Sequence, residues 1–326
     1  MASQGSQLSA LDSALRATFG ACSNRSWALS APAKVNLRLK VTGRRDDGYH
    51  YLSMLTASCS LQDELRVAWR ETSGISVAVD LPSLSTLPEA DNLVAKAYRA
   101  FWGIFGCSEN LPGFDVSITK RIPVGGGLGG GSSDAGAVLR FLVALFGPVI
   151  KDTLQLSDEA FEARVMAAAL ACGADVPYAY HGGVAWVSGV GDVVTQLPLV
   201  QVWSGLALIS VPSRPVPTAE FYRAYRESHP HITPYRDVIL EQYCQQPEPL
   251  DAQRLLDNDF EDVACQLVPE VGRALALARG VFPHTVMTGS GSAIVSLVAD
   301  GGDPGVVAEY ERAAMSQGVV VHHVSL

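Results

Sequence analysis

The segment that most constrains this chain is the glycine-rich run from Lys120 to Gly136, KRIPVGGGLGGGSSDAG. It lies between an apolar segment with the alternation of a strand, 114–118, and one with the composition of a buried helix, 135–146. Glycine has no Cβ, so Gly125–Gly127 and Gly129–Gly131 can adopt positive φ and turn several backbone N–H groups toward one anion. The N-terminus of the following helix adds a partial positive charge. The run therefore predicts a phosphate-binding loop between a strand and a helix.

The kind of phosphate loop follows by exclusion. A Walker loop closes with Gly-Lys-Ser/Thr, whereas no lysine directly follows these glycines, and a dinucleotide-binding loop needs a βαβ unit with an acidic residue about twenty positions further on. The protein kinase loop is accompanied by His-Arg-Asp and Asp-Phe-Gly segments, which this chain lacks. The plainer alternative is a flexible turn followed by a helix N-cap in Ser132-Ser133-Asp134. The apolar segments on both sides of the glycines favour the phosphate loop.

The composition predicts a soluble protein. The chain has 326 residues, 48% of them hydrophobic, which is enough for two domains or one large domain. Its net charge of −9 and the lack of a basic stripe argue against a nucleic-acid partner. The six cysteines form no CxxC or Cys/His cluster, so reduced thiols are expected. No stretch holds the ~18 continuous apolar residues of a membrane helix, so no membrane partner is expected and the protein is predicted to be cytoplasmic.

The N-terminal residues, 1–26, differ in composition from the rest of the chain. Together with Trp27 they hold six serines, two arginines and a single acid, and residues 8–19 form an amphipathic patch. A transit peptide can have such a composition, but transit peptides are richer in arginine. A poorly ordered extension or a short added helix is therefore favoured.

The first half of the chain is predicted to mix strands and helices. Alternating apolar residues predict strands at 27–41, 51–59, 64–69, 75–79, 114–118 and 183–187. Helical periodicity predicts helices at 92–102, 135–146 and 158–172. The strands and helices do not alternate as repeated βαβ units, so the pattern predicts an α+β fold.

A second domain is predicted after the loop-like residues 188–191. Strands are expected at 203–212, within 285–298 and at 318–324, and helices at 258–279 and 304–317. The intervening residues, 220–249, are rich in Pro, His, Tyr and charge, and are expected to form an irregular surface excursion.

Three segments, in this order along the chain, resemble the motifs of the GHMP small-molecule kinases: Ala31–Leu37 (APAKVNL), Pro123–Ser133 (PVGGGLGGGSS) and Met287–Ala293 (MTGSGSA). Three more are similar to segments of one family among these enzymes, the 4-diphosphocytidyl-2-C-methyl-D-erythritol kinases: Thr42–His50 (TGRRDDGYH), Gly173–Pro177 (GADVP) and Gly189–Gly191 (GVG). The resemblance runs from Trp27 to Ala299 and is thinnest between Arg223 and Pro283. One departure is Gly136, where the family pattern has alanine.

The resemblance implies an α+β, two-domain GHMP kinase fold with the active site in the interdomain cleft. The N-terminal ATP-binding and catalytic domain, similar to ribosomal protein S5 domain 2, would comprise 27–187 after an N-terminal extension at 1–26. The C-terminal substrate-binding domain, ferredoxin-like and α+β, would comprise 188–326.

The resemblance also implies an activity. A monomer or weak homodimer would use ATP and Mg²⁺ to phosphorylate the 2-hydroxyl of a small-molecule substrate, 4-diphosphocytidyl-2-C-methyl-D-erythritol, in the non-mevalonate isoprenoid precursor pathway. Asp175 is the implied catalytic base, and Lys34 would keep it ionised and offset charge on the transferring phosphoryl group. The implied nucleotide-binding residues are Asn92, Lys120, Pro123, Gly125, Gly126, Gly127, Leu128, Gly129, Gly130, Gly131, Ser132 and Ser133, the two serines also being candidate Mg²⁺ ligands.

The acceptor would be bound by residues from several segments. By resemblance these are Asn36, Tyr49, His50, Val190, Thr218, Tyr222 and Gly289. The two tyrosines would stack on the cytosine, with Phe221 a register-shifted alternative to the second, and His50 would meet the base edge. Asn36 and Thr218 would face the methylerythritol end.

Several alternatives remain open from the residues alone. Asn92 is also typical of a helix N-cap, Asp175 of a turn, and Lys34 of a side chain that reaches the surface. The alternative functions are another GHMP kinase acting on mevalonate, homoserine or a sugar, and a non-catalytic nucleotide-binding regulator on the same fold.

Overall fold

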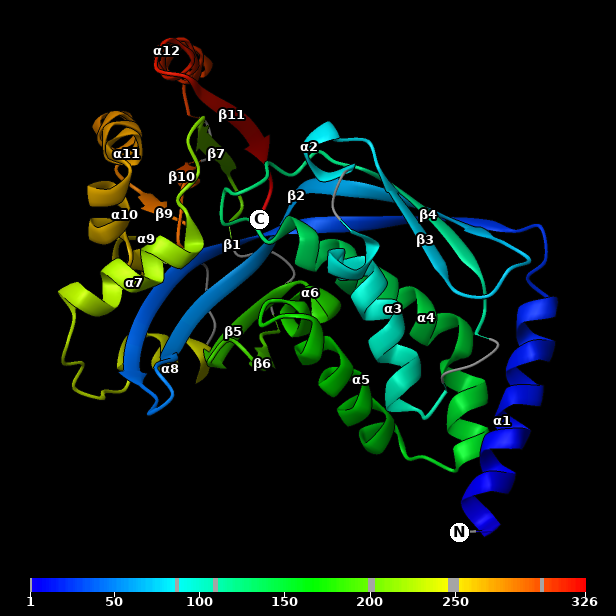
Figure 1. The fold of residues 1–326 in the computed structure, drawn as a ribbon. Helices are drawn as coiled ribbons and strands as arrows, with labels where there is room; N and C mark the ends of the chain where they lie inside the picture. Colours follow the sequence, from blue (N-terminus) through cyan, green and yellow to red (C-terminus); the bar gives the residue numbers. More distant parts are fainter. Residues whose placement is uncertain (1, 86–87, 108–110, 199–202, 246–251, 300–301) are drawn as a thin grey trace. The chain divides into compact units, whose positions relative to one another are not determined.

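The computed structural model describes residues 2–85, 88–107, 111–198, 203–245, 252–299 and 302–326 (Figure 1). These residues form two compact units, each built from segments that are distant in sequence. Unit 1 comprises 1–31, 62–121 and 130–181, and unit 2 comprises 32–61, 122–129 and 182–326. Two long strands, β1 (Ser26–Arg44) and β2 (His50–Trp69), contribute residues to both units.

Unit 1 places helices beside a small sheet. The C-terminal part of β2 pairs antiparallel with β4 (Phe114–Thr119), and β4 pairs parallel with β3 (Ile75–Val79). The long helices are α1 (Ala2–Gly20), α3 (Leu93–Ile104), α4 (Gly130–Leu154) and α5 (Asp158–Cys172). Shorter helical pieces are α2 (Pro82–Ser85), a 3₁₀ turn (Glu89–Asp91) and α6 (Val176–His181).

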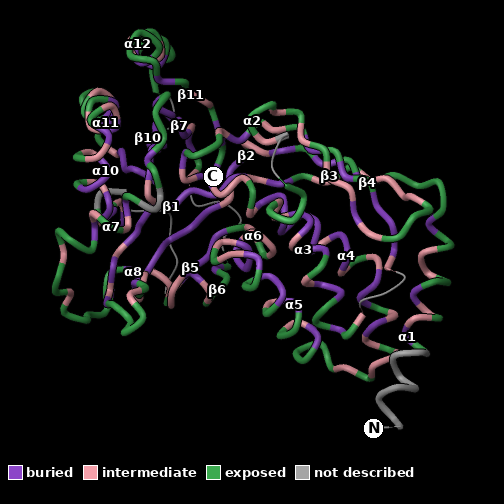
Figure 2. Tube along the Cα trace, viewed as in Figure 1, coloured by how far each residue is buried: buried purple, intermediate pink, exposed green. Residues whose placement is uncertain are grey.

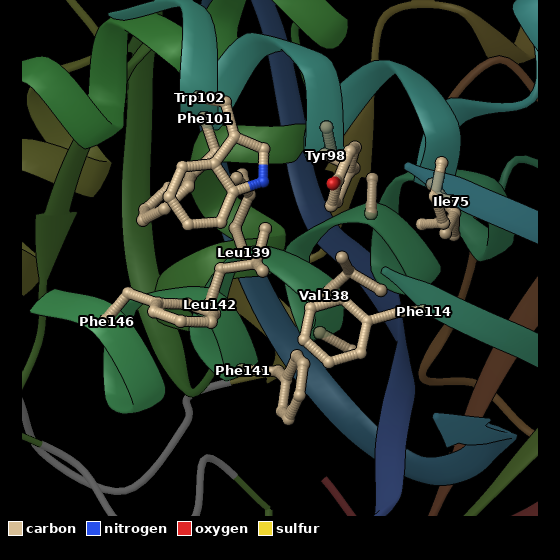
Figure 3. Packing of buried hydrophobic residues seen from close by; sticks show 14 of the residues in the cluster. Ile75, Tyr98, Phe101, Trp102, Phe114, Val138, Leu139, Phe141, Leu142 and Phe146 are labelled. Carbon is tan, nitrogen blue, oxygen red and sulfur yellow. The ribbon is translucent and has the colours of Figure 1, made fainter. Parts of the chain in front are cut away.

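The core of unit 1 is built around α4 and is rich in aromatic side chains (Figure 3). Phe114 on β4 packs edge-on against Phe141 of α4, and Trp102 of α3 packs edge-on against Phe146. Edge-to-face contacts of this kind add to the stabilisation from burial alone. Among the described helices, α4 is the one long and apolar enough to cross a membrane, and most of it lies buried in this core.

The N-terminal residues form part of unit 1. The side chains of Leu11 and Leu15 on α1 are buried in the core, and Phe19 stacks on Trp69 of β2. The short added helix is thus confirmed, and a poorly ordered extension is wrong, because the amphipathic patch has an apolar surface to cover. All six cysteines of the chain are free, as predicted.

Unit 2 contains the other parts of β1 and β2 and a separate four-stranded sheet. Strand β2 pairs with β5 (Val184–Gly189), β5 pairs with β6 (Val193–Gln196), and β1 pairs with the short β8 (Asp257–Asn258). The four-stranded sheet has the order β11-β7-β10-β9. Its members are β7 (Leu206–Pro212), β9 (Thr285–Met287), β10 (Ile294–Val298) and β11 (Val319–Val324).

Helices and strands cover opposite faces of the four-stranded sheet. Along β7, Leu208 joins a cluster with α11 (Pro269–Val281) and α12 (Pro304–Ser316), whereas its neighbours Ala207 and Ile209 join a cluster with β1. This is the alternation that a strand requires when both of its faces are buried. Both strands β7 and β10 are accordingly coloured as buried in Figure 2.

The predicted α+β pattern is confirmed, with three local corrections. The excursion at 220–249 is not irregular where it is described: it contains α7 (Thr218–Ser228) and α8 (Val238–Gln245), and 246–249 lie outside the described residues. The helix predicted at 258–279 is interrupted before Pro269, giving α10 (Glu261–Leu267) and α11, because proline cannot continue a preceding helix. Strands 51–59 and 64–69 are one strand, β2.

The remaining described helix, α9, is short (Ala252–Leu255).

The predicted domain boundary between 187 and 188 stays a prediction. Each compact unit is made of three separate segments of the chain, whereas the predicted boundary divides the chain at a single point.

Unit 1 also holds a buried cluster of charged groups. Lys120 directly follows β4, and its Nζ contacts Oδ2 of Asp63 and lies 2.8 Å from Oδ2 of Asp134, the fifth residue of α4. Burial disfavours the ammonium, but Asp134 and Asp63 outweigh this and raise the Lys120 pKa. Burial raises the pKa of Asp134 to about 7, although Lys120 opposes the shift. Oδ1 of Asp134 is buried and has no hydrogen-bond partner within the described part of the chain.

Another close contact in unit 1 involves Gly136 on α4. A Cβ at this position would lie 2.6 Å from the backbone carbon of Ala179 on α6. The alanine of the family pattern would therefore have to push the two helices apart. Glycine is a poor helix former, but here it permits their close approach.

Gly136→Ala is expected to destabilise the protein by about 1–3 kcal/mol, the usual range for overpacking. Gly103→Ala on α3 is the matched control, because a Cβ there would meet nothing within 4 Å. That variant should be unchanged or stabilised by up to about 1 kcal/mol, since it removes only the entropic cost of glycine. Urea unfolding measures both, and equal stability of the two variants would contradict the packing argument.

Asp134→Asn is expected to change how stability depends on pH. Because the folded-state pKa of Asp134 is raised to about 7, the folded protein holds this proton more tightly than the unfolded chain. The contribution of Asp134 to stability is thus fully present at low pH and is lost as pH rises toward 7. The variant lacks this loss, so its stability relative to the parent should improve between pH 5 and pH 8. Parallel pH profiles of the two unfolding free energies would contradict the assignment.

Candidate active site

The glycine loop adopts the backbone that its sequence predicts. Gly125, Gly127 and Gly129 have φ of 78°, 76° and 71°, in the left-handed region that favours glycine. Gly130 and Gly131 do not belong to the loop, because α4 already begins at Gly130. The expectation of six loop glycines is therefore corrected: the last two open the helix and supply its free N–H groups.

Lys34 lies against this loop within unit 2. Its backbone N–H donates to the carbonyl of Leu128 at 3.0 Å, and a Cβ on Gly129 would lie 2.9 Å from its Cγ. The side chain is 8% exposed, so it does not extend to the surface. Its Nζ donates to Oδ1 of Asn36 at 2.7 Å. The side chain of Leu128 is buried in the core of unit 2 and contributes to the site through its backbone.

The loop after β9 completes this arrangement. The backbone N–H of Asn36 donates to Oγ1 of Thr288 at 2.7 Å, and Ala293 N–H donates to the carbonyl of Gly126 at 3.1 Å. A Cβ on Gly127 would lie 2.9 Å from the carbonyl oxygens of both Thr288 and Gly291. Three segments that are far apart in sequence, 34–36, 125–129 and 288–293, thus form one closely packed group in unit 2.

Gly289 and its neighbours are held by a residue that the sequence did not single out. Nδ2 of Asn258, on β8, donates to the carbonyls of Met287 at 2.6 Å and Gly289 at 2.9 Å. Gly289 itself has a φ of 59°. No sequence signal marks Asn258, because its role depends on β8 pairing with β1.

The polar side chain of Asn36 is fully used within unit 2. Its Nδ2 donates to Oγ1 of Thr56 on β2 at 2.9 Å, while its Oδ1 accepts from Lys34. Asn36 therefore sets where the Lys34 ammonium lies. This positioning role comes in addition to the predicted contact with the methylerythritol end, which stays a prediction.

The predicted acceptor residues His50 and Tyr222 come together in unit 2. Their rings are stacked with centroids 6.3 Å apart, and Tyr225 packs edge-on against His50 at 5.3 Å. His50 is 6% exposed and its Nε2 is buried, with no hydrogen-bond partner among the described residues. Burial, and then the nearby Arg44, Arg226 and His229, lower the His50 pKa, so the ring is neutral near pH 7.

The other predicted acceptor residues have different surroundings. Tyr49 is 65% exposed, so its ring is accessible to a ligand. Phe221 is buried in contact with Phe260, so of the two predicted candidates Tyr222 is the one whose ring stacks with that of His50. The backbone N–H of Val190 is already bound to Oδ1 of Asp192 at 2.9 Å. The side chain of Thr218 lies outside the described part of the structure.

The remaining predicted residues lie in unit 1, apart from Pro123, which precedes the glycine loop. Ser132 and Ser133 lie in the first turn of α4, Ser133 being buried. Asn92 is the N-cap of α3, its side chain accepting from Val94 N–H at 2.9 Å. Asp175 is half-buried and directly precedes α6. The ammonium group of Lys120 is bound by the carboxylates of Asp63 and Asp134.

Comparisons with known proteins agree with this arrangement. Residues 92–183 match the family described as the GHMP kinases N terminal domain. The 4-diphosphocytidyl-2-C-methyl-D-erythritol kinase of Pseudomonas syringae pv. syringae is 37% identical over 266 residues, 82% of this chain and 83% of that protein. The enzyme of the same name from Geobacter metallireducens is 35% identical over 283 residues, 84% of this chain and 90% of that protein.

Solved structures extend the likeness to the fold. A crystal structure of 4-(cytidine 5'-diphospho)-2C-methyl-D-erythritol kinase superposes with a TM-score of 0.66 and 31% identity, covering 92% of this chain and all of that one. A homoserine kinase from Cytophaga hutchinsonii, with a TM-score of 0.64 and 18% identity, covers 92% of this chain and 94% of its own, and shares the fold alone. The predicted GHMP kinase fold is thus confirmed. With 37% identity to such a relative over an alignment that covers most of both sequences, the chain belongs to the 4-diphosphocytidyl-2-C-methyl-D-erythritol kinase family of GHMP kinases.

Proposed function

We propose that this protein transfers the γ-phosphoryl group of ATP to the 2-hydroxyl of 4-diphosphocytidyl-2-C-methyl-D-erythritol. The observation that carries the proposal is the packing of Lys34, the glycine loop and the loop at 288–291 into one group in unit 2. Positive φ at Gly125, Gly127 and Gly129 is a backbone geometry in which several N–H groups can face one anion. The activity for which the relatives are named supplies the substrate.

The proposed chemistry is an in-line displacement at the γ-phosphorus. The acceptor hydroxyl oxygen forms the new bond to phosphorus, the bond to the β,γ-bridging oxygen breaks, and ADP leaves. Asp175 accepts the hydroxyl proton as general base. Lys34 offsets the negative charge on the transferring group, and its hydrogen bond to Asn36 holds the ammonium in place before substrate arrives.

The phosphates are assigned to the glycine loop and the start of α4. Backbone N–H groups of Gly125–Gly131 and the hydroxyls of Ser132 and Ser133 would bind them, aided by the positive end of α4. Mg²⁺ would neutralise phosphate charge. The described residues contain no cluster of three or more acidic, His or Cys side chains suited to a metal, which fits an ion held mainly by phosphate oxygens with a serine hydroxyl. Pro123 and Asn92 are proposed on the nucleotide side, together with Lys120.

The cytosine of the acceptor is assigned to the aromatic group around His50. Nε2 of His50 lacks a protein partner in the described part of the chain, and a base edge is proposed as its partner once the acceptor is bound. Tyr222, stacked beside His50, and the exposed Tyr49 offer faces for the ring. Val190, whose N–H is already bound to Asp192, would contribute through its carbonyl, and Gly289 and Thr218 are proposed at the methylerythritol end.

A substrate panel tests the proposal. ADP release should depend on the cytidyl acceptor and not on mevalonate, homoserine or galactose, and ³¹P NMR should locate the new phosphate on the 2-hydroxyl. Release with another acceptor would reassign the protein within the GHMP kinases. Nucleotide binding without turnover on any acceptor would indicate a regulator.

Asp175→Asn is expected to lower kcat at least ~100-fold, the usual contribution of a general base. The Kd for ATP should change little, because the proposed phosphate ligands are untouched. Asp115→Asn, at an exposed position of β4 outside the proposed site, is a control carboxylate and should retain its turnover. Near-normal kcat in Asp175→Asn would remove the base assignment.

Tyr49→Ala is expected to raise the acceptor KM by about 5–150-fold, because stacking on a base is worth about 1–3 kcal/mol by alanine substitution. The KM for ATP should stay constant. Tyr51→Ala offers a matched control, since Tyr51 is another exposed tyrosine and it packs beside Gly43. An acceptor KM that is equally high in both variants, or unchanged in Tyr49→Ala, would refute the stacking role.

A further inference from the structure

Helix α4 is connected to two parts of the proposed chemistry within unit 1. Its first turn carries Ser132 and Ser133, and its body packs against α6, which begins directly after Asp175. Neither serine is part of α6, so the distance between the phosphate ligands and Asp175 depends on how α4 and α6 are fastened together.

Two residues of α4, one turn apart, hold α4 and α6 together. Gly136 brings the helix so close to α6 that a Cβ would lie 2.6 Å from Ala179 carbon and 2.8 Å from Tyr180 nitrogen. Arg140 Nη1 then donates to the carbonyl of Ala179, and also to that of Tyr180 at 3.0 Å. Its Nη2 donates to the carbonyl of Ser30 on β1 at 3.2 Å. One guanidinium thus joins α4, α6 and β1.

Arg140 is unusual in its electrostatic surroundings. Burial lowers its pKa, and no carboxylate lies within ion-pair distance of it in the described residues. Its charge faces carbonyl oxygens in the last turn of α6, where the helix dipole favours a cation. A partly desolvated charge without a counter-ion costs stability. The planar guanidinium of arginine can bind two adjacent carbonyl groups at once, which the single ammonium of lysine does poorly.

We propose that Arg140 is a positioning residue for the phosphoryl transfer. By holding the last turn of α6, it fixes where Asp175, at the other end of that helix, lies relative to Ser132 and Ser133. The inference rests on the proposed function, in which Asp175 is the base. Helix α6 has six residues, so it is only about 9 Å long. It therefore moves as one piece, and a displacement at Ala179 is transmitted to Asp175.

Arg140→Met tests the proposal, because methionine fills similar space without donors. We expect kcat to fall about 10–100-fold, since a misplacement near 1 Å can cost up to about 100-fold. The KM and Kd for ATP should change less than about threefold, because Arg140 touches no proposed ligand. Arg140→Lys retains the positive charge and one donor nitrogen, and it disturbs the fold less than Arg140→Met does. It should therefore recover part of the lost kcat.

Val165→Ala is the control for a general loss of stability. Val165 is fully buried in the core of unit 1 on α5 and lies outside the proposed site, so its truncation should lower the melting temperature and leave kcat unchanged. If Val165→Ala lowers kcat as much as Arg140→Met does, the effect is one of stability and the positioning role is overturned.

A double-mutant cycle identifies the residue through which Arg140 acts. In the Asp175→Asn background, Arg140→Met should lower kcat less than about threefold, because the group that it positions is already disabled. An equal loss in both backgrounds would show that Arg140 does not act through Asp175. Unchanged kcat in Arg140→Met with an active parent would overturn the inference alone. A parent without acceptor-dependent turnover would overturn the proposed function as well.

Discussion

The site in unit 2 depends on close backbone packing that only glycine permits. Gly127 lies against the carbonyls of Thr288 and Gly291, and Gly129 lies against the aliphatic part of Lys34. A side chain at either position would separate the segments, and at positive φ it would also strain the backbone. The loop that is proposed to bind phosphate is therefore held by the same contacts that hold Lys34.

Buried polar groups then give this packing a defined geometry. Asn36 is bound on three sides: its side chain accepts from Lys34 and donates to Thr56, and its backbone donates to Thr288. Asn258 holds the backbone on the far side of the 288–291 loop. Since an unsatisfied buried polar group is costly, these contacts favour one arrangement over neighbouring ones. Among the described residues, Nε2 of His50 and Oγ of Ser292 are two of the buried polar atoms that lack such a partner, and a ligand can satisfy a group of this kind.

Local signals in the sequence predicted much of this and could not predict the rest. The strand–glycine–helix succession at 114–146 identified the loop, and alternation identified most strands, because both depend on neighbouring residues. Asn258, Arg140 and the Lys120–Asp134 pair were missed as contacts, since each joins segments that only the folded chain brings together. Helices α7 and α8 were also missed: α7 has the polar composition of a loop, and α8 has only eight residues, too few for a clear helical period. The departure at Gly136 was noticed in the sequence, but its reason, the backbone of α6, is a tertiary contact.

A crystal structure with a non-hydrolysable ATP analogue and the cytidyl acceptor bound together tests the central claim most directly. The account predicts the γ-phosphate against the N–H groups of Gly127–Gly131, and the 2-hydroxyl of the acceptor about 3 Å or less from a carboxylate oxygen of Asp175, as a general base requires. A triphosphate bound away from the glycine loop, or an acceptor hydroxyl that faces a residue other than Asp175, would contradict it.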